Sequence, residues 1–178
     1  MADLMSKTAL VTGGGTGIGF GIAAKLMEAN AQVTIAGRRE DVLEEAAERL
    51  EASISSSGNI KIVCCDVTDV MAVKNAVEFA ANDNGALDIA VANAGIGAGG
   101  PFLSMTDETL RSVLEVNVIG AFNTIQASAE TMRSSGGSII AISSIAGALG
   151  GRFRAAYASS KAALDMLVRS AADELGGF

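Results

Sequence analysis

The chain has 178 residues, of which 49% are hydrophobic and 19% are charged, so it can bury a core and does not fall in the intrinsically disordered class. Its 13 basic and 20 acidic side chains give a formal net charge of −7, which argues against binding to nucleic acid or to an anionic membrane. Histidine is absent, which excludes every catalytic triad, zinc site and general base that depends on an imidazole.

Short apolar segments alternate along the chain with segments of helical periodicity. The predicted strands span residues 7–12, 32–36, 60–65, 87–92 and 138–143, and the predicted helices span residues 17–30, 40–55, 69–81, 107–132 and 154–175. The strands are apolar on both faces, as parallel strands covered by helices must be. The pattern predicts one domain over residues 1–178 with a three-layer, doubly wound, Rossmann-like α/β fold, whose five parallel strands lie in the order 3-2-1-4-5.

A glycine-rich loop reading GGGTGIG joins the first predicted strand to the first predicted helix. Backbone N–H groups and the positive end of the helix dipole can bind a phosphate there, and the missing Cβ atoms let the ligand approach. A tight strand-to-helix turn is the alternative interpretation. The candidate cofactor-binding residues of this loop are Gly13, Gly15, Thr16, Gly17, Ile18 and Gly19.

Two arginines, Arg38 and Arg39, follow the second strand, where an NAD-binding unit usually has a carboxylate for the ribose diol. An arginine can bond a 2′-phosphate with two parallel hydrogen bonds, whereas a carboxylate would repel it, so NADP is favoured over NAD. Alternatively, both are solvated charges that pair with Glu40 or Asp41.

The ends of the third and fourth strands add further candidate cofactor residues. Asp66 and Val67 end the third strand, and Asp66 could accept a hydrogen bond from an adenine amino group. The other possible role of Asp66 is to cap the next helix, for which Asp69 is the better candidate. The fourth strand closes on Asn93, Ala94 and Gly95, which serve the cofactor or only form a turn.

The adjacent Cys64 and Cys65 are interpreted as small strand residues, and no metal site is predicted. Residues 1–7 lack the basic start and long apolar stretch of a signal peptide, and no apolar run approaches the roughly 20 residues of a membrane span. A reducing, cytoplasmic location is therefore expected.

Tyr157 is the only tyrosine, and Lys161 follows it four residues later on the last predicted helix. The phenol and the ammonium therefore lie one helical turn apart on one face, where the cation favours the phenolate. Such a tyrosine could exchange protons with an alcohol or a carbonyl. Alternatively, the tyrosine packs at the helix start beside a lysine that extends to solvent.

Ser143 and Ser144 end the fifth strand, where a hydroxyl could donate a hydrogen bond to a substrate oxygen or form an ordinary turn. Asn117 falls within the apolar stripe of the long helix 107–132. A buried amide must be satisfied, so Asn117 either bonds a neighbouring backbone or holds a buried water leading toward Lys161.

Taken together, these segments resemble the short-chain dehydrogenase/reductase family over essentially the whole chain. Residues 12–19 are similar to that family's cofactor motif, residues 93–95 to its strand 4 motif, and residues 157–161 to its active-site motif. Asn117 and Ser144 stand where the family's other catalytic residues would.

The resemblance implies reversible NADP(H)-dependent reduction of a carbonyl to a secondary alcohol, on a 3-oxoacyl thioester, a steroid, a sugar or a simple ketone. Tyr157 would protonate the carbonyl oxygen, Ser144 would polarise it, and Lys161 would bond the nicotinamide ribose and favour the ionised tyrosine. Asn117 would anchor the water of a proton relay.

The resemblance also implies a homodimer or homotetramer formed through the helices 107–132 and 154–175. Relatives continue past the last predicted helix with further strands and a substrate loop, so the chain is expected to be a fragment that lacks this region. This absence keeps open the alternative of a catalytically inactive NADP-binding module.

Overall fold

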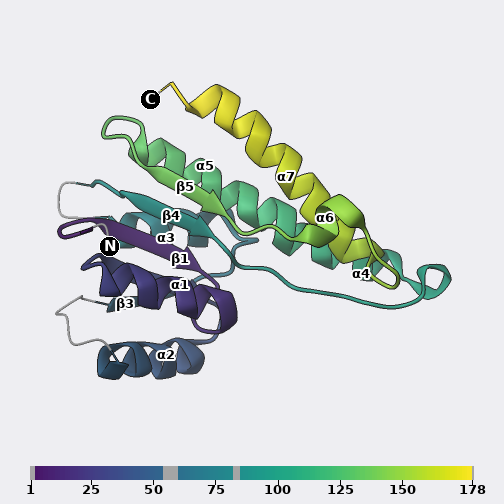
Figure 1. The fold of residues 1–178 in the computed structure, drawn as a ribbon, viewed down its shortest axis with the longest axis horizontal. Coiled ribbons are helices and arrows are strands. Elements are labelled where there is room, and N and C mark those ends of the chain that lie inside the picture. The colour runs from purple at the N-terminus through teal and green to yellow at the C-terminus, as the bar shows by residue number, and fades with distance from the viewer. Residues whose placement is uncertain (1–2, 54–59, 82–84, 178) are drawn as a thin grey trace.

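The computed structural model describes residues 3–53, 60–81 and 85–177, which form a five-stranded parallel sheet (Figure 1). The order β3-β2-β1-β4-β5 confirms the predicted topology. All four neighbouring pairs of strands are parallel. The strands are β1 (Thr8–Thr12), β2 (Gln32–Gly37), β3 (Ile60–Cys64), β4 (Ile89–Ala92) and β5 (Ser138–Ala141).

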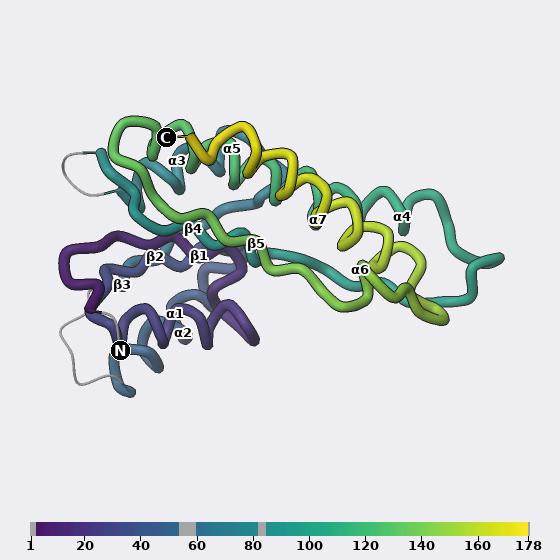
Figure 2. The backbone as a smooth tube through the Cα atoms, turned by 45° about the horizontal axis from the view of Figure 1, so that its top comes forward, coloured from purple at the N-terminus to yellow at the C-terminus, as the bar shows by residue number. Residues whose placement is uncertain are grey.

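Helices cover both faces of the sheet, which gives the predicted three layers (Figure 2). The helices α1 (Gly17–Glu28) and α2 (Glu40–Ser53) pack on one face around Val11 and Ile35. On the other face lie α3 (Val70–Ala80), α5 (Gly120–Met132) and α7 (Ala155–Leu175). Within the described ranges, no helix is both long and apolar enough to cross a membrane.

Burial follows the position of each strand in the sheet. Every residue of β1 is buried, because this strand lies near the middle with helices on both faces. The expectation that all strands are apolar and covered on both faces is wrong for β3 and β5, in which several side chains are exposed. These two strands are the edges of the sheet, where fewer helices cover them, and Ile140 of β5 is 48% exposed.

Most predicted boundaries agree with the structure, and the differences concern short elements. The strand predicted for residues 138–143 ends at Ala141 and is followed by α6 (Ile145–Leu149), which is too short to show a helical period. A 3-10 turn, η1 (Phe102–Ser104), precedes the long helix. The last two residues of the helix predicted for 40–55 lie outside the described residues.

The long helix predicted for residues 107–132 has the expected extent but not a uniform conformation. It consists of α4 (Asp107–Leu114), a π-helical turn η2 (Glu115–Ile119) and α5. The π turn centres on Asn117, and such turns inside α-helices are frequent at functional sites.

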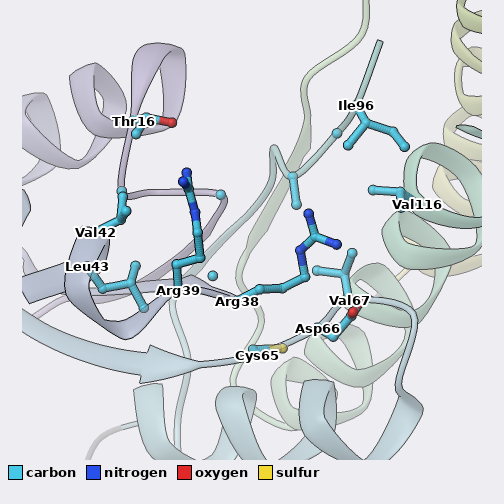
Figure 3. Close-up of a pocket in the computed structure, with 15 residues that line it drawn as sticks. Thr16, Arg38, Arg39, Val42, Leu43, Cys65, Asp66, Val67, Ile96 and Val116 are labelled. Atoms are coloured by element: carbon cyan, nitrogen blue, oxygen red, sulfur yellow. The ribbon is translucent and has the colours of Figure 1, made fainter. Parts of the chain in front are cut away.

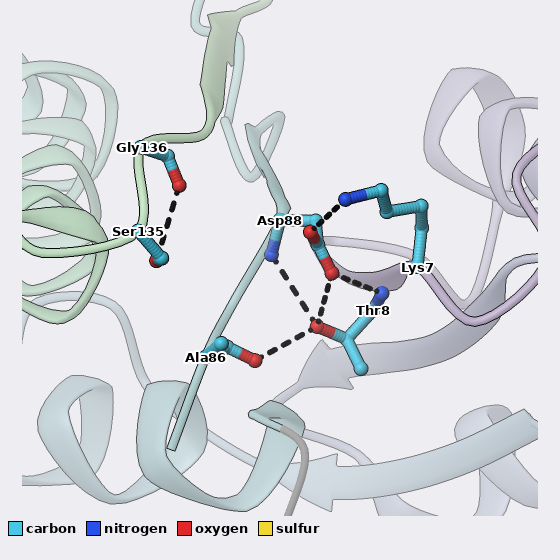
Figure 4. Close-up of polar contacts among 6 residues, drawn as sticks. All are labelled: Lys7, Thr8, Ala86, Asp88, Ser135 and Gly136. Carbon is cyan, nitrogen blue, oxygen red and sulfur yellow. Dashed lines mark hydrogen bonds and ion pairs between the residues drawn. The ribbon is translucent and has the colours of Figure 1, made fainter. Parts of the chain in front are cut away.

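At the amino-terminal edge of the sheet, the carboxylate of Asp88 joins the segments that lead into β1 and β4 (Figure 4). It accepts hydrogen bonds from Lys7 Nζ at 2.7 Å and from the Thr8 backbone N–H at 2.9 Å. The Thr8 hydroxyl lies 3.2 Å from Asp88 Oδ2 and accepts from the Asp88 N–H at 3.3 Å. This edge is opposite the carboxyl ends of the strands, where ligands bind. The network therefore stabilises the pairing of the strands and is not part of a ligand site.

Replacing Asp88 with asparagine is expected to lower the free energy of unfolding at pH 7 by about 1–2 kcal/mol, because an amide cannot replace the charge-assisted bonds. Burial raises the pKa of Asp88, but the hydrogen bonds from Lys7 and Thr8 outweigh it, so the net pKa is lowered. A lowered folded-state pKa means that this stability is present above the unfolded-state pKa of about 3.9 and is lost as the pH falls through the folded-state value. Urea denaturation at several pH values checks this, and a constant difference between the two proteins from pH 7 to pH 3 would contradict it.

Candidate active site

A cleft opens at the carboxyl ends of β1 to β4, the edge at which doubly wound sheets bind ligands (Figure 3). Its walls come from the loops that follow these four strands, from the start of α2 and from the π turn. The lining residues are Gly13, Gly15, Thr16, Gly37, Arg38, Arg39, Val42, Leu43, Cys65, Asp66, Val67, Ala94, Gly95, Ile96 and Val116.

The glycine loop is a compact cradle supported from β4. Gly13 and Gly17 have positive φ angles of 66° and 56°, which suit glycine. A Cβ on Gly19 would collide with the carbonyl oxygen of Gly13, so the first turn of α1 packs directly on the loop. Asn93 Nδ2 donates to the backbone oxygens of Thr12 at 2.9 Å and Gly13 at 3.2 Å. These bonds make Asn93 a support for the glycine loop, a role that differs from the cofactor contact and the turn considered for it in the sequence.

Arg38 and Arg39 directly follow β2 and both line the cleft, and Figure 3 shows their side chains among those of the other lining residues. Within the described part of the chain, neither arginine forms an ion pair with Glu40 or Asp41. Both arginines are exposed, as the alternative of solvated charges expects, but the pairing with Glu40 or Asp41 that it includes is absent from this described segment.

Asp66 lies on the floor of the cleft and accepts, at Oδ1, hydrogen bonds from the Thr68 backbone N–H at 3.0 Å and the Thr68 hydroxyl at 2.8 Å. The Thr68 N–H bond is the main cause that lowers the pKa of Asp66; burial opposes it, and the Thr68 hydroxyl and the Arg38 charge add to the lowering. Helix α3 is capped by Asp69, as predicted, through the N–H groups of Met71 and Ala72.

Lys161 is only 5% exposed, and its Nζ donates to the backbone oxygen of Ile142 at 2.6 Å. The same Nζ lies 5.8 Å from the centre of the Tyr157 ring, so the predicted pair lies together on α7. Burial lowers the pKa of Lys161, and the negative charge of Asp165 one turn further along α7 acts in the opposite direction. The alternative in which Lys161 extends to solvent is wrong.

Asn117 is buried, and its amide joins the loop after β4 to α7. Oδ1 accepts from the Ile96 N–H at 2.8 Å, and Nδ2 donates to the Ile96 oxygen and to Ser160 Oγ, both at 2.9 Å. Ser160 Oγ in turn donates to the backbone oxygen of Tyr157 at 2.7 Å. Of the two predicted roles, these contacts match the bonding of a neighbouring backbone.

The two serines at the end of the fifth strand contact α6 and α7. Ser144 Oγ accepts from the Ala146 N–H at 3.2 Å and so caps α6. Ser143 Oγ lies 3.5 Å from the backbone oxygen of Lys161. The turn-forming role considered for these serines is therefore present for Ser144.

The predicted cofactor residues divide into two sets. Those that line the cleft are Gly13, Gly15, Thr16, Arg38, Arg39, Asp66, Val67, Ala94 and Gly95, whereas Gly17, Ile18, Gly19, Asn93, Tyr157 and Lys161 do not. The sequence analysis missed the lining residues Gly37, Val42, Leu43, Cys65, Ile96 and Val116. Gly37, Cys65 and Ile96 adjoin predicted residues, which is a usable signal, but Val42, Leu43 and Val116 resemble ordinary core positions of helices.

Comparison with known proteins finds that the model of the short chain dehydrogenase family matches residues 7–177. The chain is 39% identical to (+)-borneol dehydrogenase 2 from Salvia officinalis, over 97% of this chain and 61% of that protein. It is 37% identical to a 3-oxoacyl-[acyl-carrier-protein] reductase from Staphylococcus aureus, over 96% of this chain and 69% of that protein. The chain therefore spans about two thirds of the length of such relatives.

The fold is similar to solved structures as well. A short-chain type dehydrogenase/reductase from Mycobacterium ulcerans superposes with a TM-score of 0.94 and 38% identity, over 99% of this chain and 65% of that one. One from Mycobacterium marinum gives a TM-score of 0.92 and 36% identity, over 98% of this chain and 71% of that one.

Replacing Asn117 with alanine is expected to lower the free energy of unfolding by roughly 2–4 kcal/mol, because the partly buried N–H and C=O of Ile96 both lose their partner. The exposed amide of Asn75, on α3, gives a matched control whose replacement by alanine should change stability by less than about 0.5 kcal/mol. Thermal and urea unfolding measure both variants. Equal stability of the two variants would contradict a structural role for the Asn117 amide.

Proposed function

The chain belongs to the short-chain dehydrogenase family, and from that premise we propose that it catalyses the reversible NADP(H)-dependent reduction of a carbonyl to a secondary alcohol. The observation that carries the proposal is the pairing of the chain's only phenol, Tyr157, with the buried ammonium of Lys161. The relatives are named as a borneol dehydrogenase and a 3-oxoacyl reductase, which supports chemistry at a carbonyl or an alcohol. The substrate classes that we propose are a 3-oxoacyl thioester, a steroid, a sugar or a simple ketone.

The cleft fits a nicotinamide dinucleotide. Gly13 and Gly15 line it without a Cβ, and the amino-terminal end of α1 follows them, which suits a pyrophosphate. Arg38 and Arg39 supply positive charge beyond the end of β2, which supports a 2′-phosphate and hence NADP over NAD. Asp66 and Val67 would bind the adenine, and Ala94 and Gly95 would contact the middle of the cofactor. When bound, the nicotinamide supplies or accepts the hydride.

Tyr157 would give its hydroxyl proton to the carbonyl oxygen in reduction and take it back in oxidation. Lys161 would stabilise the phenolate formed in this step and bond the nicotinamide ribose. Its ammonium has three donors and Ile142 uses one of them, so two N–H groups remain. Ser144 Oγ accepts a hydrogen bond from Ala146, which leaves the hydroxyl proton free to polarise the substrate oxygen.

Asn117 would serve the proton relay in a restricted way. Both hydrogens of its Nδ2 are bonded, one to the Ile96 oxygen and one to Ser160 Oγ. A relay water at Asn117 would therefore donate a hydrogen bond to an oxygen, either Asn117 Oδ1 or the Ile96 carbonyl oxygen, and would not accept one from the amide nitrogen.

We further infer that two copies of the chain associate through α5 and α7, as a homodimer or within a homotetramer. An apolar groove between these helices, lined in part by Phe122, Ile125 and Leu167, supports a second copy as the occupant. Phe122 is 40% exposed, and packing against an equivalent helix pair would bury it.

Replacing Tyr157 with phenylalanine is expected to reduce kcat for NADPH-dependent ketone reduction by roughly 10²- to 10⁴-fold, the usual contribution of a general acid. The dissociation constant for NADPH should change little, because the ring itself remains. Oxidation of NADPH with a panel of ketones, followed at 340 nm, together with fluorescence titration, measures the two quantities. Cofactor binding by the unaltered chain without turnover of any ketone would instead favour a catalytically inactive NADP-binding module.

Replacing both Arg38 and Arg39 with alanine is expected to weaken NADPH binding by roughly 10- to 100-fold, because charge-assisted bonds to the 2′-phosphate are lost. NADH binding should stay nearly constant, since NADH has a hydroxyl at that position. Arg169→Ala, at an exposed position on α7 away from the cleft, is the control. Equal losses for NADPH and NADH, or no loss for either, would refute the assignment of the 2′-phosphate to these arginines.

A further inference from the structure

Helix α5 reaches the floor of the cleft through Asn123. The side-chain Nδ2 of Asn123 donates a hydrogen bond of 2.9 Å to the backbone oxygen of Val67, across 56 positions of the chain. Asn123 is 6% exposed, so this bond lies in a dry environment. A buried carbonyl without a donor is unfavourable, so loss of the amide would favour movement of Val67.

Gly120 lies one turn earlier on α5 and brings the helix backbone directly against the same residue. A Cβ added to Gly120 would lie 2.5 Å from Val67 Cγ2 and 3.0 Å from Val67 Cβ. The helix therefore holds Val67 by a close backbone approach at Gly120 and by a hydrogen bond at Asn123. A contact this close transmits a displacement of the helix to the residue that it touches.

Val67 lines the floor of the cleft together with Cys65 and Asp66 (Figure 3). The rest of this turn is fixed by its own residues, since Asp66 bonds Thr68 and Asp69 caps α3. The bond from Asn123 is a link from the interior of a distant helix to this turn. The position of the turn, and not only its shape, therefore depends on α5.

We propose that Asn123 is a positioning residue for the adenine end of the cofactor. It holds the Val67 backbone so that Val67 and Asp66 face the ligand, with Gly120 as the surface against which Val67 packs. This inference rests on the proposed function, because it takes a nicotinamide dinucleotide as the ligand of the cleft.

The test compares the unaltered chain with Asn123→Leu, which keeps the number and branching of the side-chain heavy atoms but removes the donor. Calorimetric titration with 2′,5′-ADP, the adenine-containing part of NADP, is expected to show binding weakened by about 5- to 10-fold in Asn123→Leu. The adjacent Thr124 is equally buried, and its hydroxyl bonds the Gly120 oxygen within its own helix. Thr124→Val therefore perturbs the same helix without touching the turn and should bind 2′,5′-ADP as the unaltered chain does.

A second measurement does not depend on a folded variant. Hydrogen exchange of the unaltered chain should slow in peptides covering residues 65–69 when 2′,5′-ADP is added, and also in peptides covering residues 119–124, which do not line the cleft. Slowing confined to residues 65–69, or equal affinity of a folded Asn123→Leu variant, would overturn the role of Asn123.

If the proposed function is wrong, cofactor binding by the unaltered chain shows it separately. If the unaltered chain binds neither NADPH nor NADH, the cofactor assignment itself is wrong. If it binds NADH alone, the preference for NADP is wrong, and the same comparison with 5′-AMP in place of 2′,5′-ADP still tests Asn123, since both cofactors contain this group.

Discussion

The buried amide of Asn117 is the interaction on which the geometry of the candidate site depends. It bonds the N–H and the oxygen of Ile96 in the loop after β4, and it bonds Ser160 next to Lys161 on α7. The parallel sheet brings the loops to one edge, but it does not fix α7 relative to the loop after β4. Asn117 supplies that link, and the π turn around it places the amide between the two segments.

The same long helix also bonds the turn after β3, through Asn123. Two asparagines six positions apart therefore fix the segments that follow β3 and β4. Both amides are buried, and an unpaired polar group is costly in the interior of a protein. This explains why polar residues occupy positions that the helical period assigns to the core. Their burial specifies one arrangement of the loops, which an apolar side chain of the same size would not do.

The sequence alone predicts the topology of the sheet and most of the residues that line the cleft. Alternating strand and helix periods determine the parallel order, and the order places residues such as Gly13, Arg38 and Asp66 at one edge. What it does not predict depends on tertiary contacts: the π turn at Asn117, the cap of α6 by Ser144, and the bond between Asn123 and Val67. Likewise, the exposed side chains of the edge strand β5 follow from its place in the sheet and not from its apolar composition.

The polar groups around the cleft differ in how many of their hydrogen-bond donors are already used. This difference separates side chains that only support the structure from side chains that can also bond a reacting group. Both amide hydrogens of Asn117 are bonded to protein atoms, so its side chain has no donor left for a ligand. Asn93 Nδ2 likewise donates to two backbone oxygens of the glycine loop. Lys161 and Ser144, in contrast, each make one bond that orients the side chain and retain donors. A group that is held in place yet still has a free N–H or O–H can bond an oxygen that develops charge, with little reorganisation at the moment of reaction.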